Sequence, residues 1–119
     1  MASDQNYKIT LGGKEISFEL TSLAEQANGK ILIRIGDTVA LVTTVMSRHP
    51  LDNLAFFPLT VEYEERFYAA GKILGSRYMR REGRPSDEAV ITARVIDRAI
   101  RPLFPAGFNR EVQVICTVL

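Results

Sequence analysis

The sequence predicts an α/β protein of the α+β kind, with a mostly antiparallel sheet from N-terminal hairpins and one long helix packed on it. Two observations lead to this fold class. In several short segments, apolar residues alternate with polar ones, which is the period of a half-buried strand. In residues 86–100 the apolar side chains recur instead at helical spacing.

Two hairpins are expected near the N-terminus. The first joins strands over residues 7–11 and 14–20 through a Gly-Gly pair, which suits a tight turn because glycine adopts positive φ at little steric cost. The second joins residues 30–35 to the β-branched run TVALVTTVM at 38–46. That run is apolar enough to be a central strand.

A further strand is expected over residues 56–67, after a polar loop. Glu62 and Glu64 share one face of it and Glu65 follows; we interpret these carboxylates as a solvated face rather than as an acid/base pair. His49 is interpreted as a solvated loop residue. No group of His, Cys or carboxylate residues has the spacing of metal ligands.

The helix over residues 86–100 has clear signals at both ends. Ser86 is a plausible N-cap, and acidic residues in the first turn complement the helix dipole. Pro102 ends the helix, because the residue before proline avoids the α region. Asp97 and Arg101 are four residues apart and can pair. The predicted buried stripe is Ala89, Ala93, Ile96, Ile100 and Leu103.

Composition is that of an ordinary globular domain, with 46% hydrophobic and 24% charged residues. No apolar run approaches the roughly 18 residues of a membrane span, and no secretory signal is evident, so we expect a cytoplasmic protein. Cys116 is expected to be a small core residue. The last strand, over residues 111–119, ends on an apolar run, so we expect residues 1–119 to be a partial, N-terminal fragment of a domain.

Arginine is concentrated in one stretch of a nearly neutral chain, which has 15 basic and 14 acidic residues. Seven arginines and four acids lie between Arg77 and Arg101, a net charge of +3 (7 − 4). A local excess of this kind favours a surface that binds phosphates.

The loop before the helix holds four of these arginines, with an aromatic and a thioether side chain among them. Unpaired bases stack on aromatic and guanidinium planes while arginines bind the phosphates, so the loop suits single strands better than duplex. These residues alone leave RNA and DNA both open. Arg94 and Arg98 on the helix are candidates for further contacts, and the alternative is a solvated helix face.

Several motifs resemble the first RNase PH-type core of bacterial polynucleotide phosphorylases. They are FFPLTVEYEERFYAAGKILGS, RREGRPS, VIDRAIRPLFPAGF and EVQVI, and the resemblance extends from about Lys8 to Leu119. It implies a phosphorolytic 3′-to-5′ exoribonuclease that degrades single-stranded RNA in mRNA decay. Inorganic phosphate is its co-substrate, and nucleoside diphosphates are its products.

The resemblance also implies a homotrimer around a channel and a requirement for Mg²⁺, with no membrane or DNA partner. The phosphate site and the metal ligands of that family lie chiefly in a second core. We therefore expect no catalytic residue and no metal ligand in this chain, and no activity from it alone.

The same resemblance assigns roles in the loop. Tyr78 and Met79 stack on the RNA or constrict its path, and Arg80 and Arg81 hold its phosphates. Arg84 corresponds to an arginine that contacts phosphate in simple RNase PH enzymes. Arg77 departs from the family pattern, as an inserted residue that adds a possible contact.

Two other functions stay open at this point. One is a non-catalytic RNA-binding or scaffold subunit of an exosome-type ring. The other is a stand-alone RNase PH exoribonuclease, against which the segments FFPLTVEY and RPLFPAGF argue.

Overall fold

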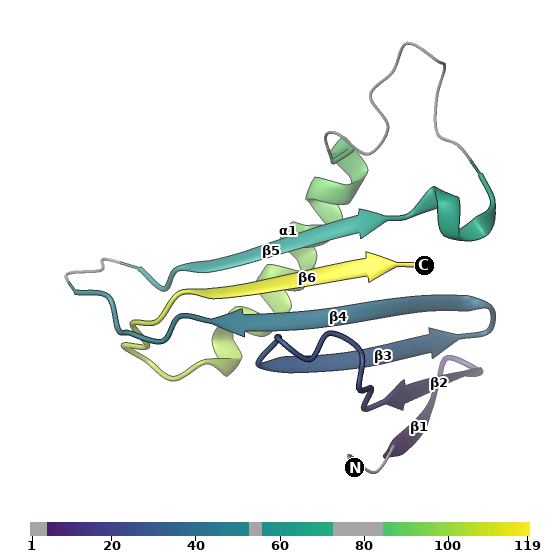
Figure 1. Ribbon diagram of the computed structural model, residues 1–119, viewed down its shortest axis with the longest axis horizontal. Helices are drawn as coiled ribbons and strands as arrows, with labels where there is room; N and C mark the ends of the chain where they lie inside the picture. The colour runs from purple at the N-terminus through teal and green to yellow at the C-terminus, as the bar shows by residue number, and fades with distance from the viewer. Residues whose placement is uncertain (1–4, 53–55, 73–84) are drawn as a thin grey trace.

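The computed structural model describes residues 5–52, 56–72 and 85–119, which form one six-stranded sheet with a single α-helix against it (Figure 1). The strands are β1 (Asn6–Leu11), β2 (Lys14–Glu19), β3 (Gly29–Ile35), β4 (Thr38–Met46), β5 (Leu59–Glu65) and β6 (Val112–Val118). The helix is α1 (Asp87–Ile100), and two short 3₁₀ turns are η1 (Phe67–Ala70) and η2 (Arg101–Leu103).

The sheet has the order β1-β2-β3-β4-β6-β5. The first four strands form the two predicted hairpins, and all neighbours pair antiparallel except β5 and β6, which are parallel. Gly12 and Gly13 close the first hairpin with φ of +59° and +77°, as a Gly-Gly turn predicts. The mostly antiparallel sheet is therefore confirmed.

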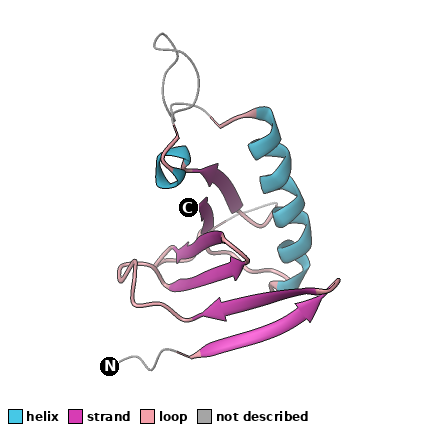
Figure 2. Cartoon of the chain, turned by 90° about the vertical axis from the view of Figure 1, so that its right-hand side faces the viewer, coloured by secondary structure: helices cyan, strands magenta, loops and turns pink. Residues whose placement is uncertain are grey.

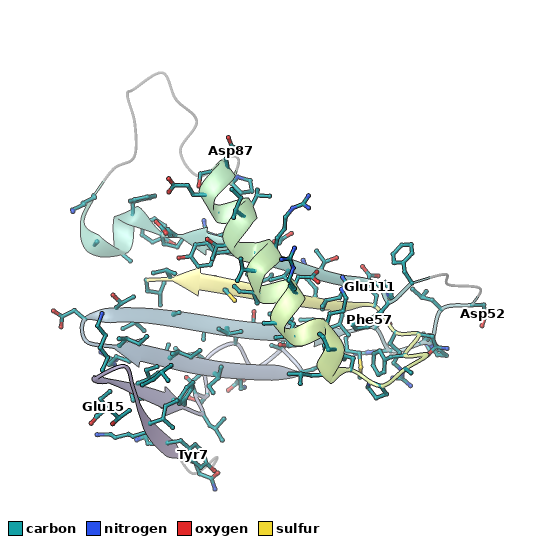
Figure 3. All side chains as sticks on the ribbon, turned by 180° about the vertical axis from the view of Figure 1, so that it is seen from behind. Tyr7, Glu15, Asp52, Phe57, Asp87 and Glu111 are labelled. Atoms are coloured by element: carbon teal, nitrogen blue, oxygen red, sulfur yellow. The ribbon has the colours of Figure 1, made fainter. Side chains whose placement is uncertain are left out.

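The chain leaves β5 at one edge of the sheet, forms α1, and returns as β6 between β5 and β4. Seen from the helix side, with β5 and β6 pointing upward, β6 lies to the left of β5 (Figures 1 and 3). This is a left-handed crossover, the rare hand for a parallel β-α-β unit. It leaves β5 as an edge strand beside the helix.

One face of the sheet carries the core, because α1 covers that face over β5 and β6 (Figure 2). Leu59, Val112, Val114 and Cys116 are buried there. Partly buried apolar side chains of β4, β5 and α1 pack around them, together with three phenylalanines, Phe57, Phe104 and Phe108.

Two expectations need correction. Leu103 is 81% exposed rather than buried, because α1 ends at Ile100 and η2 turns the chain away from the sheet. The strand expected over 56–67 is shorter at both ends, since Phe56 is exposed before β5 begins and residues after Glu65 form η1.

Candidate nucleic-acid interface

The arginine-rich loop lies outside the described residues. Its predicted RNA-binding side chains are Arg77, Tyr78, Met79, Arg80, Arg81 and Arg84, all within residues 73–84. Their roles stay predictions. The geometry of the interface therefore comes from α1 and β5, which the structure describes.

The N-terminus of α1 is fixed by the predicted cap. The Ser86 hydroxyl accepts a hydrogen bond from the Ala89 amide at 3.1 Å, and Asp87 and Glu88 occupy the first turn. Ala89 and Ala93 are buried. Small side chains at these positions let the helix lie close to β5, which sets the width of the space between them.

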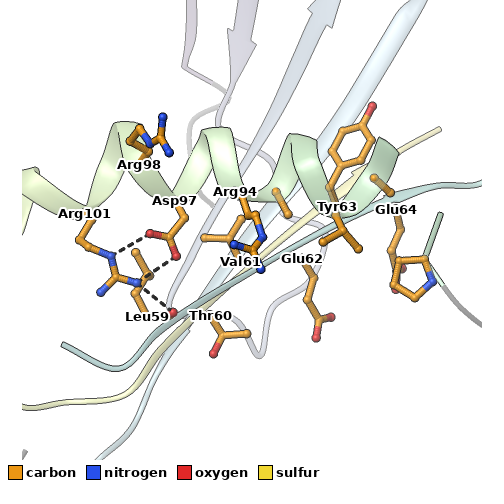
Figure 4. A pocket seen from close by; sticks show the side chains of 14 residues that line it. Leu59, Thr60, Val61, Glu62, Tyr63, Glu64, Arg94, Asp97, Arg98 and Arg101 are labelled. Carbon is orange, nitrogen blue, oxygen red and sulfur yellow. Dashed lines mark hydrogen bonds and ion pairs between the residues drawn. The ribbon is translucent and has the colours of Figure 1, made fainter. Parts of the chain in front are cut away.

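A groove of about 830 Å³ runs between β5 and α1 (Figure 4). Strand residues form one wall and helix residues the other. The lining residues include Leu59, Thr60, Val61, Glu62, Tyr63 and Glu64 from β5, and Ala93, Arg94, Asp97, Arg98 and Arg101 from α1 and the turn after it. Three of the seven arginines singled out in the sequence thus share one concave surface.

Arg101 is held within the protein. Its Nε donates to Asp97 Oδ1 at 2.8 Å and its Nη2 to Asp97 Oδ2 at 3.0 Å, which confirms the predicted pair. Its Nη1 donates to the Phe57 carbonyl at 2.8 Å, and Nη2 also lies 3.4 Å from the Leu59 carbonyl. Hydrogen bonding to Asp97 raises the pKa of Arg101 above its usual value. We call this set of contacts the Arg101 clamp.

Arg94 and Arg98 differ from Arg101. Both are exposed, and neither takes part in a hydrogen bond or ion pair within the described part of the chain. Figure 4 shows Arg94 beside β5 and Arg98 at the outer rim. The two lie one helical turn apart, about 6 Å along the axis. Asp97 lies between them, but the clamp neutralises its charge.

The predicted solvated face of β5, on the side of the sheet away from α1, is largely confirmed. Glu62 and Glu65 are exposed, while Glu64 is half-buried and pairs with Arg66. The Tyr63 hydroxyl donates to Glu65 Oε1 at 3.1 Å, and burial raises the pKa of this tyrosine, with the hydrogen bond and the Glu65 charge adding to the shift. Of these three carboxylates, Glu62 alone has no partner among the residues that the structure describes.

Other candidate groups have structural explanations. Cys116 is 7% exposed, and burial raises the pKa of its thiol, so it is a core residue as predicted. His49 is exposed in a turn, where the Ser47 hydroxyl donates to its carbonyl oxygen. Within residues 5–52, 56–72 and 85–119, no three His, Cys, Asp or Glu side chains come together as a metal site.

Among the described helices, none is long and apolar enough to cross a membrane.

The chain is similar in sequence and in fold to known proteins. Residues 12–119 match the 3′ exoribonuclease family, domain 1. Proteins named polyribonucleotide nucleotidyltransferase are similar to the chain: one from Exiguobacterium sibiricum is 55% identical over 115 residues, covering 97% of this chain and 15% of the relative. One from Shouchella clausii is 56% identical over 113 residues, which cover 95% of this chain and 16% of the relative. The chain thus spans about 15% of the length of these relatives.

A solved structure is similar in fold. A chain of the Archaeoglobus fulgidus exosome, with RNA bound to the active site, matches 87% of this chain and 41% of its own length. The TM-score is 0.53 and the sequence identity 23%, a likeness of fold.

Proposed function

Because this chain belongs to the 3′ exoribonuclease family, through that family's first domain, we propose that it is the N-terminal part of a polyribonucleotide nucleotidyltransferase. The observation that carries the proposal is 55% identity over 97% of the chain with a protein of that name. The full-length protein then degrades single-stranded RNA from the 3′ end with inorganic phosphate, releases nucleoside diphosphates and acts in mRNA decay.

Within that reaction, this segment captures RNA. Phosphorolysis needs a positioned phosphate, stabilisation of charge on the transferred phosphoryl group and a threaded 3′ end. We assign only the threading to this chain. Tyr78 and Met79 stack on the strand, and Arg80 and Arg81 bind its phosphates. Arg84 and the inserted Arg77 add positive charge beside them.

Arg94 and Arg98 extend this surface onto α1. They are supported as RNA contacts because both guanidinium groups are exposed, unpaired within the described residues and beside a groove. A purely solvated face is the alternative. The Arg101 clamp removes Arg101 from the same role, since its donors are occupied by Asp97 and two carbonyls.

The remaining components belong to the rest of the full-length protein. The proposal places the metal ligands and the phosphate site in a second core, as the resemblance to polynucleotide phosphorylases implies. When bound, Mg²⁺ supplies positive charge to the transferred phosphoryl group. A homotrimer and a cytoplasmic location are parts of the same proposal.

A scaffold subunit of an exosome-type ring is less well supported. The exosome chain shares the fold at 23% identity, whereas relatives named polyribonucleotide nucleotidyltransferase share 50–56%. A stand-alone RNase PH has less support for the same reason.

The proposal is tested by phosphate-dependent release of nucleoside diphosphates from poly(A). The full-length protein is expected to release them, and the isolated 119-residue chain is expected to release none. Absence of release by the full-length protein contradicts the enzymatic function. Release by the isolated chain contradicts the assignment of catalysis to residues outside it.

A further inference from the structure

We propose that Tyr68, on the turn η1, is a platform on which one unpaired base of the bound strand stacks. The ring contributes affinity that does not depend on charge, beside the phosphate contacts made by arginines. The inference rests on the proposed function, because it takes single-stranded RNA as the ligand. It adds a described residue that contacts a base.

Three aromatic side chains are more than half exposed in the described part of the chain: Tyr7 at 55%, Phe56 at 73% and Tyr68 at 64%. Tyr7 belongs to β1, at the opposite edge of the sheet from β5. Phe56 precedes β5 and therefore lies at the far end of that strand from η1. Of the three rings, Tyr68 is the one that adjoins the predicted RNA contacts within residues 73–84.

The turn that carries Tyr68 is fixed to the sheet. The Arg66 amide donates to the Val118 carbonyl at 2.9 Å, which ties the start of η1 to the end of β6. Within the turn, the Ala69 amide donates to the Arg66 carbonyl and the Gly71 amide to the Tyr68 carbonyl, each at 3.0 Å. Gly71 closes the turn with a φ of +74°. A side chain on a backbone that is already ordered loses less freedom when it binds a ligand.

The ring is also accessible within its turn. Phe67 is half-buried, whereas Tyr68 and the two small residues after it, Ala69 and Ala70, are exposed. Neither alanine is large enough to cover an aromatic ring. A tyrosine has two side-chain torsions and offers a large contact area at a low entropic cost.

The position of η1 suits a strand that follows the groove. Glu64 and Pro85 line the groove, one at the end of β5 and the other just before α1. In two views, η1 and the first turn of α1 lie at the same end of the molecule (Figures 1 and 2). A strand that passes Arg98 and then Arg94 on the helix therefore approaches η1, where a base can leave the backbone and stack.

Charge near η1 is balanced, so the ring differs from the arginines in the kind of affinity it supplies. The end of β5 and the turn after it hold two acids, Glu64 and Glu65, and two bases, Arg66 and Lys72, a net charge of zero (2 − 2). Glu64 and Arg66 form an ion pair. Stacking on Tyr68 should therefore change the affinity without changing its salt dependence, which reports phosphate contacts.

The stacking is tested with Tyr68→Leu and Tyr68→Phe in the full-length protein. Binding of fluorescein-labelled oligo(A) and oligo(U) of equal length is measured by anisotropy over a range of salt concentrations. Tyr68→Leu is expected to weaken oligo(A) binding about tenfold and oligo(U) binding less, because a purine has the larger face for stacking. The slope of log K against log salt is expected to stay unchanged. Tyr68→Phe keeps the ring and should bind within about twofold of the wild type.

Tyr7→Leu is the matched control, since it removes an exposed tyrosine from the other edge of the sheet. Three results overturn the inference: a Tyr68→Leu variant that binds RNA as the Tyr7→Leu variant does, equal losses in Tyr68→Leu and Tyr68→Phe, or a changed salt slope. Mass photometry tests the other occupant of an exposed ring, a neighbouring subunit. Dissociation of the full-length oligomer by Tyr68→Leu shows a subunit contact and also overturns the inference.

The loop variant Arg80→Ala with Arg81→Ala separates the two proposals. If it weakens RNA binding while Tyr68→Leu has no effect, the proposed function survives and the stacking platform fails. If neither variant alters RNA binding, RNA capture by this segment fails as well.

Discussion

The helix α1 and the turn η2 that follows it carry the same type of side chain and use it differently. In η2, the guanidinium of Arg101 binds Asp97 and two carbonyls, one before β5 and one within it, and its carbon lies 5.7 Å from the centre of the Phe57 ring. In the middle of the helix, Arg94 and Arg98 have no partner in the described residues. Arginine is structural where the fold satisfies its donors, and available to a ligand where the fold leaves them open.

The largest expected effect on stability comes from breaking the clamp. Arg101→Ala leaves the half-buried Asp97 carboxylate and the Phe57 carbonyl without their donor, so we expect a loss of about 2 kcal/mol in the free energy of unfolding. Urea titration followed by circular dichroism measures it. Arg98→Ala is the matched control and should stay within about 0.5 kcal/mol of the wild type. Equal losses in the two variants would remove the distinction between the two regions.

The N-terminal end of the helix gives a smaller effect. Ser86→Ala removes the hydroxyl that accepts from the Ala89 amide, and the expected cost is about 1 kcal/mol, measured by the same titration. Ser86→Asp, which restores an acceptor, should recover most of it. A Ser86→Ala variant as stable as the wild type would show that the cap contributes nothing to holding α1 over β5.

The smallest effect is a dependence on alkaline pH. Burial raises the pKa of the Cys116 thiol in the folded chain above its usual value of 9.0, so the folded state holds the proton more tightly than the unfolded state. Its contribution to stability is complete below that value and is lost as pH rises through the folded pKa. Thermal melts between pH 8 and 10.5 should show a shallower decline for Cys116→Ala than for the wild type. If the melting temperatures of the two proteins decline equally with pH, the claim that the Cys116 thiol is buried would be contradicted.

Local patterns in the sequence predicted much of this fold. The alternation of apolar and polar residues predicted both hairpins. Ser86 and Pro102 predicted the ends of α1 to within one residue. The prediction that Leu103 is buried was wrong, because it continued the helical spacing past the proline that ends the helix. The parallel pairing of β5 with β6 and the left-handed crossover were not predicted, because both depend on contacts between residues far apart in the chain.

In the candidate site too, features set by local spacing could be predicted from the sequence, and features set by contacts between distant residues could not. The arginines and the Asp97–Arg101 pair follow from spacing, but the bonds of Arg101 to carbonyls 44 and 42 residues away do not. Those bonds are what separate Arg101 from Arg94 and Arg98. The groove was missed because it forms only when β5 becomes an edge strand beside α1. The loop residues from Arg77 to Arg84 stay predictions, since they lie outside the described residues.

The central claim is that arginines of this segment bind the phosphates of single-stranded RNA. The most direct measurement is the salt dependence of oligo(A) binding by the full-length protein, with and without Arg80→Ala and Arg81→Ala. The account predicts weaker binding and a slope of log K against log salt that is smaller by about 1.4. A slope and an affinity equal to those of the wild type would contradict it.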